Sequence, residues 1–202
     1  QNPKTPDLKP FYYLKGEIKI EDFVRSLTTR VVTKQYKGNS GKVVVVGGSQ
    51  EYTGAPYYAA VSALRAGADL SHIFCPEEAM TPIKCYSPEI IVHPSSAPLQ
   101  DWLPLANSFV VVAALAELVT PIYRHELVLG REDSKARKSI VLDADALWFV
   151  ADSQVVKSLI VNNEHHDYIL TPNLIEFKRL QDSYGLQAST DTSLEVQKLS
   201  EL

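Results

Sequence analysis

The 202-residue chain contains only two cysteines and no apolar run of membrane-spanning length. Cys75 ends an apolar run and Cys85 lies in a predicted helix, so neither belongs to a disulfide framework or a metal knuckle. Even the apolar stretch at residues 42–48 is far shorter than the roughly 20 residues of a transmembrane helix. These absences exclude a disulfide-stapled domain and a membrane span, and they favour a reducing compartment.

Positive charge is also scarce. The 20 Lys and Arg residues are outnumbered by 24 Asp and Glu residues, which gives a formal net charge of -4. The basic residues are scattered rather than gathered into a run, so the chain has no basic field to hold a phosphate backbone. We expect no nucleic-acid partner.

The hydrophobic content of 45% is enough for one sizeable core. We expect an N-terminal arm with a short amphipathic helix at residues 1–40, an α/β domain at 41–182 and a polar tail at 183–202 that ends in a helix from residue 193. Because the chain begins at Gln1 rather than Met, we expect that preceding residues were removed or left out. The compartment stays open between mitochondria and cytoplasm.

Short β-rich apolar runs alternate with helical segments along the domain. The six runs are residues 43–46, 70–74, 90–92, 109–112, 140–142 and 168–170. Helical character is clearest at residues 55–66 and 153–161. Uniformly apolar strands separated by helices predict a doubly wound α/β domain with a parallel sheet covered on both faces.

Ligands of such folds bind outside the carboxyl ends of the strands. The segments that follow the six runs are Gly47-Gly48-Ser49, Pro76-Glu77, His93-Pro94, Ala113-Ala114, Asp143-Ala144-Asp145 and Thr171-Pro172-Asn173. Candidate functional side chains are therefore expected among these segments.

The segment after the first strand is the most informative. Paired glycines, Gly47 and Gly48, let the backbone turn sharply, and Thr53 and Gly54 precede a helix with Pro56 near its first turn. Free amides at that helix start favour an anion such as a phosphate. A capped strand–helix connection without a ligand explains the same residues equally well.

Two later segments carry polar side chains with alternative roles. Asp143 and Asp145 can hold a metal-bound phosphate or a sugar hydroxyl, but we expect at least one of them to cap the following helix. Asn173 and Glu176 have the spacing of a capping box.

The remaining histidines and aromatic residues are interpreted as structural. His93, His125, His165 and His166 lack metal-ligand spacing and are read as surface or loop residues. Tyr12, Tyr13, Tyr57, Tyr58 and both tryptophans are expected to pack rather than to form a stacking platform.

Five segments together resemble one family. Residues 47–57, 63–70, 83–94, 142–145 and 170–179 resemble, in order and spacing, the eukaryotic ATP-dependent NAD(P)H-hydrate dehydratases of the ribokinase-like group. The resemblance implies a three-layer α/β/α domain, with a mostly parallel sheet and a missing C-terminal third. It also implies dehydration of NADH or NADPH hydrates, driven by ATP or ADP hydrolysis with Mg²⁺ present.

The resemblance further implies where ligands bind. The expected substrate-binding residues are Tyr52, Thr53, Gly54, Asn173, Glu176, Phe177, Lys178 and Arg179. Gly48, Ser49, Asp143 and Asp145 are expected near a phosphate or a metal ion, with no ligand set for the metal defined.

Two departures from the family pattern weigh against catalysis. Where the family has Gly-Pro-Gly-Leu-Gly-Arg, this chain has Val-Ala-Ala-Leu-Ala-Glu at residues 112–117, and Ala146 replaces a usual glycine. Added side chains fill space and restrict positive φ, and Glu117 exchanges a cation for an anion near phosphates. The family's Gly-Asp loop, which supplies the catalytic base, has no counterpart here, so no catalytic residue is assigned. We expect activity to be lost or severely impaired, without productive binding of ATP and Mg²⁺.

Three functions stay open from the sequence. The chain is part of an active dehydratase whose last third lies outside this sequence, a degenerate structural subunit whose protein partner covers the truncated sheet, or a nucleotide-binding sensor without turnover.

Overall fold

A computed structural model describes residues 36–112, 138–162 and 166–186 of the chain. Val31–Leu180 form one compact unit, and the structure describes only residues 181–186 of the other. In that short stretch the Leu186 N–H donates to the Gln181 carbonyl at 3.0 Å. The expected helices near residues 18–27 and 193–202 and the segment 113–117 lie outside the described residues. The domain boundaries expected from the sequence stay a prediction.

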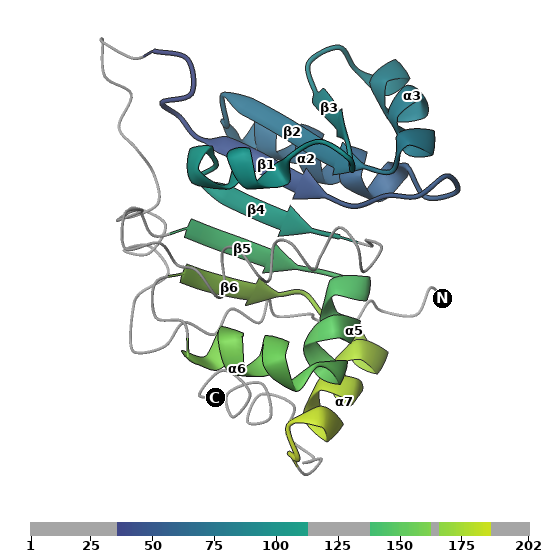
Figure 1. The fold of residues 1–202 in the computed structure, drawn as a ribbon, viewed down its shortest axis with the longest axis vertical. Helices are drawn as coiled ribbons and strands as arrows, with labels where there is room; N and C mark the ends of the chain where they lie inside the picture. The colour runs from purple at the N-terminus through teal and green to yellow at the C-terminus, as the bar shows by residue number, and fades with distance from the viewer. Residues whose placement is uncertain (1–35, 113–137, 163–165, 187–202) are drawn as a thin grey trace, which may run out of the picture. The chain divides into compact units, whose positions relative to one another are not determined.

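The described residues form a six-stranded sheet in which every neighbouring pair is parallel, in the order β3-β2-β1-β4-β5-β6 (Figure 1). The strands are β1 Lys42–Val46, β2 Leu70–Cys75, β3 Ile91–Pro94, β4 Ser108–Val111, β5 Lys138–Leu142 and β6 His166–Leu170. Each overlaps one of the six apolar runs. The predicted parallel α/β sheet is confirmed.

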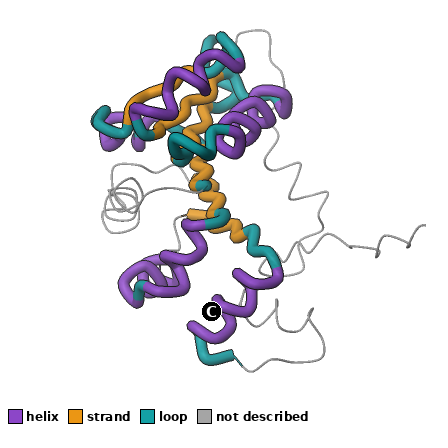
Figure 2. The backbone as a smooth tube through the Cα atoms, turned by 90° about the vertical axis from the view of Figure 1, so that its right-hand side faces the viewer, coloured by secondary structure: helices purple, strands orange, loops and turns teal. Residues whose placement is uncertain are grey.

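Helices flank the strands (Figure 2). They are α2 Gly54–Ala66, α3 Glu77–Tyr86, α5 Asp145–Asp152, α6 Gln154–Asn162 and α7 Leu174–Ser183, with short 3₁₀ turns η1 Leu99–Asp101 and η2 Leu103–Leu105. Helix α2 ends at Ala66, and its C-cap, Gly67, has a φ of 113° and donates its N–H to the Leu64 carbonyl at 3.0 Å. Within the described ranges, no helix has the length and apolar character to cross a membrane.

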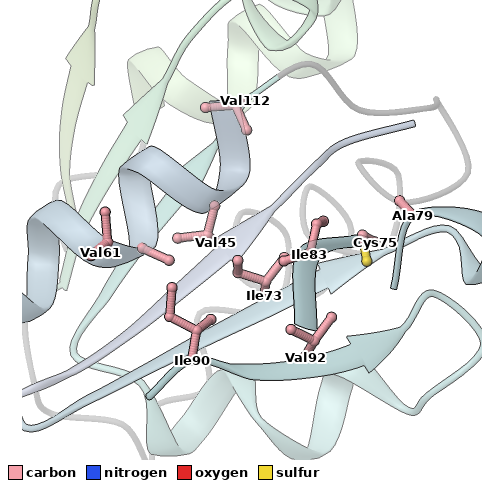
Figure 3. Close-up of a cluster of buried hydrophobic side chains, with 10 residues drawn as sticks. Val45, Val61, Ile73, Cys75, Ala79, Ile83, Ile90, Val92 and Val112 are labelled. Carbon is pink, nitrogen blue, oxygen red and sulfur yellow. The ribbon is translucent and has the colours of Figure 1, made fainter. Parts of the chain in front are cut away.

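One face of the β1–β3 half of the sheet carries a compact apolar cluster (Figure 3). Val45 of β1 and Ile73 of β2 lie at its centre and are fully buried. Ala60 of α2 and Ile83 of α3 cover them and are equally buried. Alternate strand residues point to one face, so this cluster fixes α2 and α3 on the same side of the sheet.

Strand β1 lies in the middle of the sheet, at the point where the strand order reverses: β2 and β3 follow on one side of β1, and β4, β5 and β6 follow on the other. Val44 pairs with His72 of β2 on one side and with Phe109 of β4 on the other. Reciprocal hydrogen bonds of 2.9 Å join Lys42 and Asn107 at the amino ends of these two central strands. A ligand crevice is expected where strand order reverses, outside the carboxyl ends of β1 and β4.

A histidine pair occupies the opposite face of β2 and β3. His72 is 3% exposed, and its Nδ1 lies 2.9 Å from Nε2 of His93. Trp102 packs against both rings, at centroid distances of 4.6 and 4.7 Å, and Phe74 stacks on His93. Burial, with a smaller effect of His93 and Lys42, lowers the pKa of His72 to about 4. Burial likewise lowers the pKa of His93, with a smaller contribution from Lys84.

The interpretation of His93 and His166 as surface or loop residues was wrong. His93 lies inside β3, which continues to Pro94 rather than ending at residue 92, and so neither residue belongs to a crevice loop. His166 is the first residue of β6 and is buried. The prediction was wrong because His93 directly follows one apolar run and His166 lies just before another, and strand boundaries are hardest to place at such positions.

Candidate functional site

The turn between β1 and α2 is built on its paired glycines. Gly47 and Gly48 have φ values of 151° and 101°, and the Gly47 N–H continues the sheet by donating to the Phe74 carbonyl at 3.0 Å. A Cβ on Gly48 would lie 3.1 Å from Cγ of Pro56 and 3.3 Å from the Tyr52 carbonyl oxygen. The predicted sharp turn is confirmed, and at residue 48 both the backbone conformation and the space require glycine.

The turn closes on itself through Ser49 and Tyr52. The Ser49 N–H donates to the Tyr52 carbonyl at 3.1 Å, and the Tyr52 N–H donates to Oγ of Ser49 at the same distance. The Ser49 hydroxyl oxygen therefore already accepts a bond inside the turn. The Tyr52 ring is left 69% exposed beside it.

Thr53 occupies the N-cap of α2 without capping it. Its φ and ψ of -99° and -16° are helical, and its hydroxyl bonds the Tyr86 hydroxyl at 2.7 Å rather than a helix amide. Pro56, the third residue of the helix, has no N–H to cap, and the N–H groups of Gly54 and Ala55, in the first turn, have no partner inside the helix.

The start of α2 also differs in charge from the starts of the other helices that follow a strand. Its first turn contains no acidic residue, whereas the first turns of α3, α5 and α7 carry Glu77 and Glu78, Asp145 and Glu176, respectively. A helix N-terminus attracts anions through its free amides and its dipole, and a nearby carboxylate opposes a second anion. Among the described helices that follow a strand, α2 is therefore the best placed to accept a phosphate.

The carboxyl ends of β5 and β6 are joined by their own side chains. The Thr171 hydroxyl donates to Oδ1 of Asp143 at 2.8 Å, and the Thr171 N–H donates to the Leu142 carbonyl at 3.2 Å. The structure thus brings Asp143 and Thr171 together, as expected for residues at neighbouring strand ends. One carboxylate oxygen of Asp143 is already used in this contact.

The expectation that an aspartate caps α5 is wrong. The N-cap is Ala144, with no side-chain hydrogen bond, and Asp145 is the first helical residue. Ala144 has a φ of 52° and a ψ of -121°, and the Ala146 N–H closes the turn onto the Asp143 carbonyl at 3.1 Å. These are the angles of a type II′ turn, which favours glycine at this position. The alanine is held in a strained backbone conformation at the sheet edge.

The capping box predicted at α7 is confirmed. The Asn173 N–H donates to Oε2 of Glu176 at 2.8 Å, and Oδ1 of Asn173 accepts from the N–H groups of Ile175 and Glu176 at 2.9 and 3.1 Å. Phe177 is buried on the helix, so its ring is largely unavailable to a ligand. Of the expected substrate-binding residues in this segment, Lys178 and Arg179 have exposed side chains.

Metal-ligating side chains are sparse in the described ranges. No group of three or more His, Cys, Asp or Glu residues there has the geometry to hold a metal ion. Asp143 and Asp145 supply carboxylates, and Mg²⁺ is commonly bound by one or two carboxylates together with nucleotide phosphates. The described residues thus do not form a complete Mg²⁺ site of their own, and they fit Mg²⁺ only as an ion carried by a nucleotide.

The contacts that sequence reasoning missed are long-range. Nothing in the local pattern around Tyr86 pairs its hydroxyl with Thr53, 33 residues earlier, and nothing around His72 indicates its bond to His93. Helix α3 ends at Tyr86 and α2 begins after Thr53, so only the packing of both helices on one sheet face brings the two hydroxyls together.

Solved structures define the class of this fold. The chain is similar to a ribokinase-like superfamily protein of Enterococcus faecalis V583, with a TM-score of 0.65 and 18% identity over 94% of this chain and 66% of that one. It is also similar to the ADP/ATP-dependent NAD(P)H-hydrate dehydratase of Bacillus subtilis, with a TM-score of 0.59 and 23% identity over 88% of this chain and 57% of that one. The fold is therefore ribokinase-like.

Sequence comparison then identifies the family. Residues 43–201 match the NAD(P)H-hydrate dehydratase family model. The chain is 43% identical to the ATP-dependent (S)-NAD(P)H-hydrate dehydratase of Mus musculus, over 83% of this chain and 51% of the relative. The corresponding Homo sapiens protein is 42% identical, over 88% and 52%. The chain belongs to the NAD(P)H-hydrate dehydratase family, and it spans about half the length of these relatives.

Proposed function

We propose that this chain is a nucleotide-binding member of the family that receives a hydrated nicotinamide nucleotide at the crevice beside α2, and that turnover by this polypeptide is lost or severely impaired. The proposal of nucleotide binding rests on the open start of α2. Gly54 and Ala55 present free N–H groups there, and no carboxylate stands in the first turn.

The geometry favours the first turn of α2 over the aspartates as the anchor for the nucleotide phosphates. Asp143 is already bonded to Thr171, and its negative charge opposes a phosphate in the absence of a cation. The names of the relatives and of the Bacillus subtilis structure, which was co-crystallised with ATP and Mg²⁺, support a nucleotide as the ligand class.

The impairment is supported by the sequence at residues 112–117. Val112 is 5% exposed within the apolar cluster, and its N–H donates to the Val46 carbonyl at 3.0 Å. Its side chain is therefore accommodated by the core rather than by the crevice. The support for impairment is therefore the sequence of residues 113–117, where Ala114, Ala116 and Glu117 stand in place of two of the family's glycines and its arginine.

Binding and turnover should be measured on the 202-residue chain with NADPH hydrate, ATP and Mg²⁺. We expect calorimetry to detect binding of NADPH hydrate while turnover falls about 10²-fold or more below that of the mouse relative. The variant Ala114→Gly/Ala116→Gly/Glu117→Arg is expected to bind ATP more tightly than the wild type. Turnover of the wild-type chain at the mouse rate would refute the impairment, and the absence of heat with every ligand would refute nucleotide binding.

A structural-subunit role is the second candidate. Ile169 on β6 and Leu174 and Ile175 at the start of α7 are 43%, 67% and 72% exposed. A protein partner that covers them would explain their exposure. Sedimentation of the purified chain tests this role, because a stable monomer that acquires no partner contradicts it.

A further inference from the structure

A hydrogen bond between two hydroxyl groups ties the end of α3 to the start of α2. Oγ1 of Thr53 and the Tyr86 hydroxyl oxygen are 2.7 Å apart, the usual distance for a hydrogen bond between two hydroxyl groups. Tyr86 is the last residue of α3, so its ring projects from a helix end that the buried Ile83 fixes against the sheet.

The Tyr86 ring is held by a second tyrosine. Tyr57, in the first turn of α2, meets Tyr86 edge-on at a centroid distance of 5.1 Å, and Tyr58 meets Tyr57 in the same manner at 5.5 Å. Both Thr53 and Tyr57 therefore join the beginning of α2 to Tyr86. The hydroxyl bond adds a directional contact to ring packing that would persist without it.

The bond has a consequence for the helix amides. A threonine at an N-cap ordinarily turns its oxygen toward the second or third helix amide. Here the third helical residue is Pro56, and the Thr53 hydroxyl is held by Tyr86, so the Ala55 N–H is left without a side-chain cap. The hydroxyl and the amides are consequently separate polar groups at the start of α2.

We propose that Tyr86 is a positioning residue: its hydroxyl holds the Thr53 hydroxyl away from the amides of α2, so that Thr53, Gly54 and Ala55 together bind the substrate nucleotide. This role rests on the proposed nucleotide binding at α2. Tyr86 acts through Thr53 and is not itself a catalytic residue.

The central test is Tyr86→Phe in the 202-residue chain, with NADPH hydrate as the calorimetric probe. The variant keeps the ring against Tyr57 and loses only the hydroxyl. We expect the affinity for NADPH hydrate to fall about 5- to 10-fold, the effect of one lost hydrogen bond. Thr53→Val should weaken binding at least as much, whereas Thr53→Ser, which keeps a hydroxyl, should restore most of the affinity.

Tyr58→Phe is the matched control. Tyr58 belongs to the same ring cluster and is 67% exposed, and no hydrogen bond of its hydroxyl is found within the described residues. Its removal should leave the affinity within twofold of the wild type. An equal loss in Tyr58→Phe and Tyr86→Phe would overturn the positioning role, because the effect would then be a general response to tyrosine loss.

A ligand-free measurement separates this inference from the proposed function. In a double-mutant cycle of Tyr86→Phe and Thr53→Val, followed by urea unfolding, the two changes should be coupled about threefold in the unfolding equilibrium constant. Additive changes would overturn the hydroxyl contact whatever the ligand does. Wild-type binding with an unchanged Tyr86→Phe affinity would overturn the positioning role alone. A wild-type chain that binds no NADPH hydrate would refute the proposed function and the positioning role with it.

Discussion

The strand–helix connections at the two halves of the sheet use their polar groups differently. After β1, the turn bends through glycines, and Thr53 bonds a distant tyrosine instead of its own helix, which leaves the first amides of α2 open. After β5 and β6, polar groups satisfy one another: Asp143 accepts from Thr171, and Asn173 and Glu176 close a capping box.

A polar residue at a strand's carboxyl end is therefore not automatically available to a ligand. A group that already makes a short hydrogen bond must exchange that bond for the ligand, and the net gain is then small. The Gly54 and Ala55 amides at the start of α2 require no such exchange. We therefore expect the β1–α2 connection to contribute most of the binding energy and the β5 and β6 connections to contribute mainly stability.

Gly48→Ala should have the largest effect on stability and on nucleotide binding at the β1–α2 connection. The alanine would adopt a φ of 101° and its Cβ would press on Pro56 and the Tyr52 carbonyl, so we expect about 3 kcal/mol of lost stability and loss of nucleotide binding. Urea unfolding measures the first effect and calorimetry the second.

Two glycine variants control for the cause. Gly67 has a φ of 113° but nothing within 4 Å of an added Cβ, so Gly67→Ala should show the backbone strain alone, about 1–2 kcal/mol. Gly54 meets only the Tyr58 ring at ordinary contact distance, so Gly54→Ala should be nearly neutral for stability. Equal losses at residues 48 and 67 would show that close packing of the turn is unimportant.

Acid should lower the stability of the strand region that anchors the β1–α2 turn. The Gly47 N–H is anchored to Phe74, which stacks on His93, the partner of His72. Because the pKa of His72 is about 4 when folded and 6.5 ordinarily, the unfolded chain binds the extra proton between these values. Stability is therefore full above about pH 6.5 and falls as the pH drops to about 4, by on the order of 3 kcal/mol.

Unfolding of the wild type and of His72→Gln from pH 7.5 to 4 checks this expectation. The variant should lose much of the pH dependence, because it lacks the imidazole whose pKa burial lowers to about 4 in the folded chain. An identical pH profile for both proteins would show that other groups, and not His72, control acid stability.

Asn173→Ala should have the smallest effect on stability, and it tests directly whether the β6–α7 connection serves stability rather than ligand binding. Loss of the cap should cost about 1 kcal/mol of stability, while Asn173→Asp, which keeps the acceptor, should cost less. Affinity for NADPH hydrate should change little in either variant. A large loss of affinity without loss of stability would mean that this side chain serves the ligand after all.

Local sequence patterns predicted most of the fold. Apolar runs of three to five residues are sufficient to locate parallel strands, and the Asn173 and Glu176 spacing specifies a cap within one helical turn. The glycine turn was predictable for the same reason, since it depends on the backbone freedom of Gly47 and Gly48.

The rest of the candidate site could not be read in this way. The Thr53–Tyr86 and His72–His93 contacts join residues that are 33 and 21 positions apart, and only the packing of helices and strands brings them together. The N-cap of α5 was missed because an alanine with positive φ contradicts local propensity. Such a conformation persists only where the surrounding structure imposes it.

The central position of β1 affects how the chain folds during its synthesis. Its residue Val44 pairs with His72 after 28 positions but with Phe109 only after 65, and both pairings are needed to enclose it. During synthesis the first of these partners emerges well before the second, so β1 spends an interval with one unpaired edge. We expect this interval, closed when Asn107 reaches Lys42, to be the stage at which the nascent chain is most prone to aggregate.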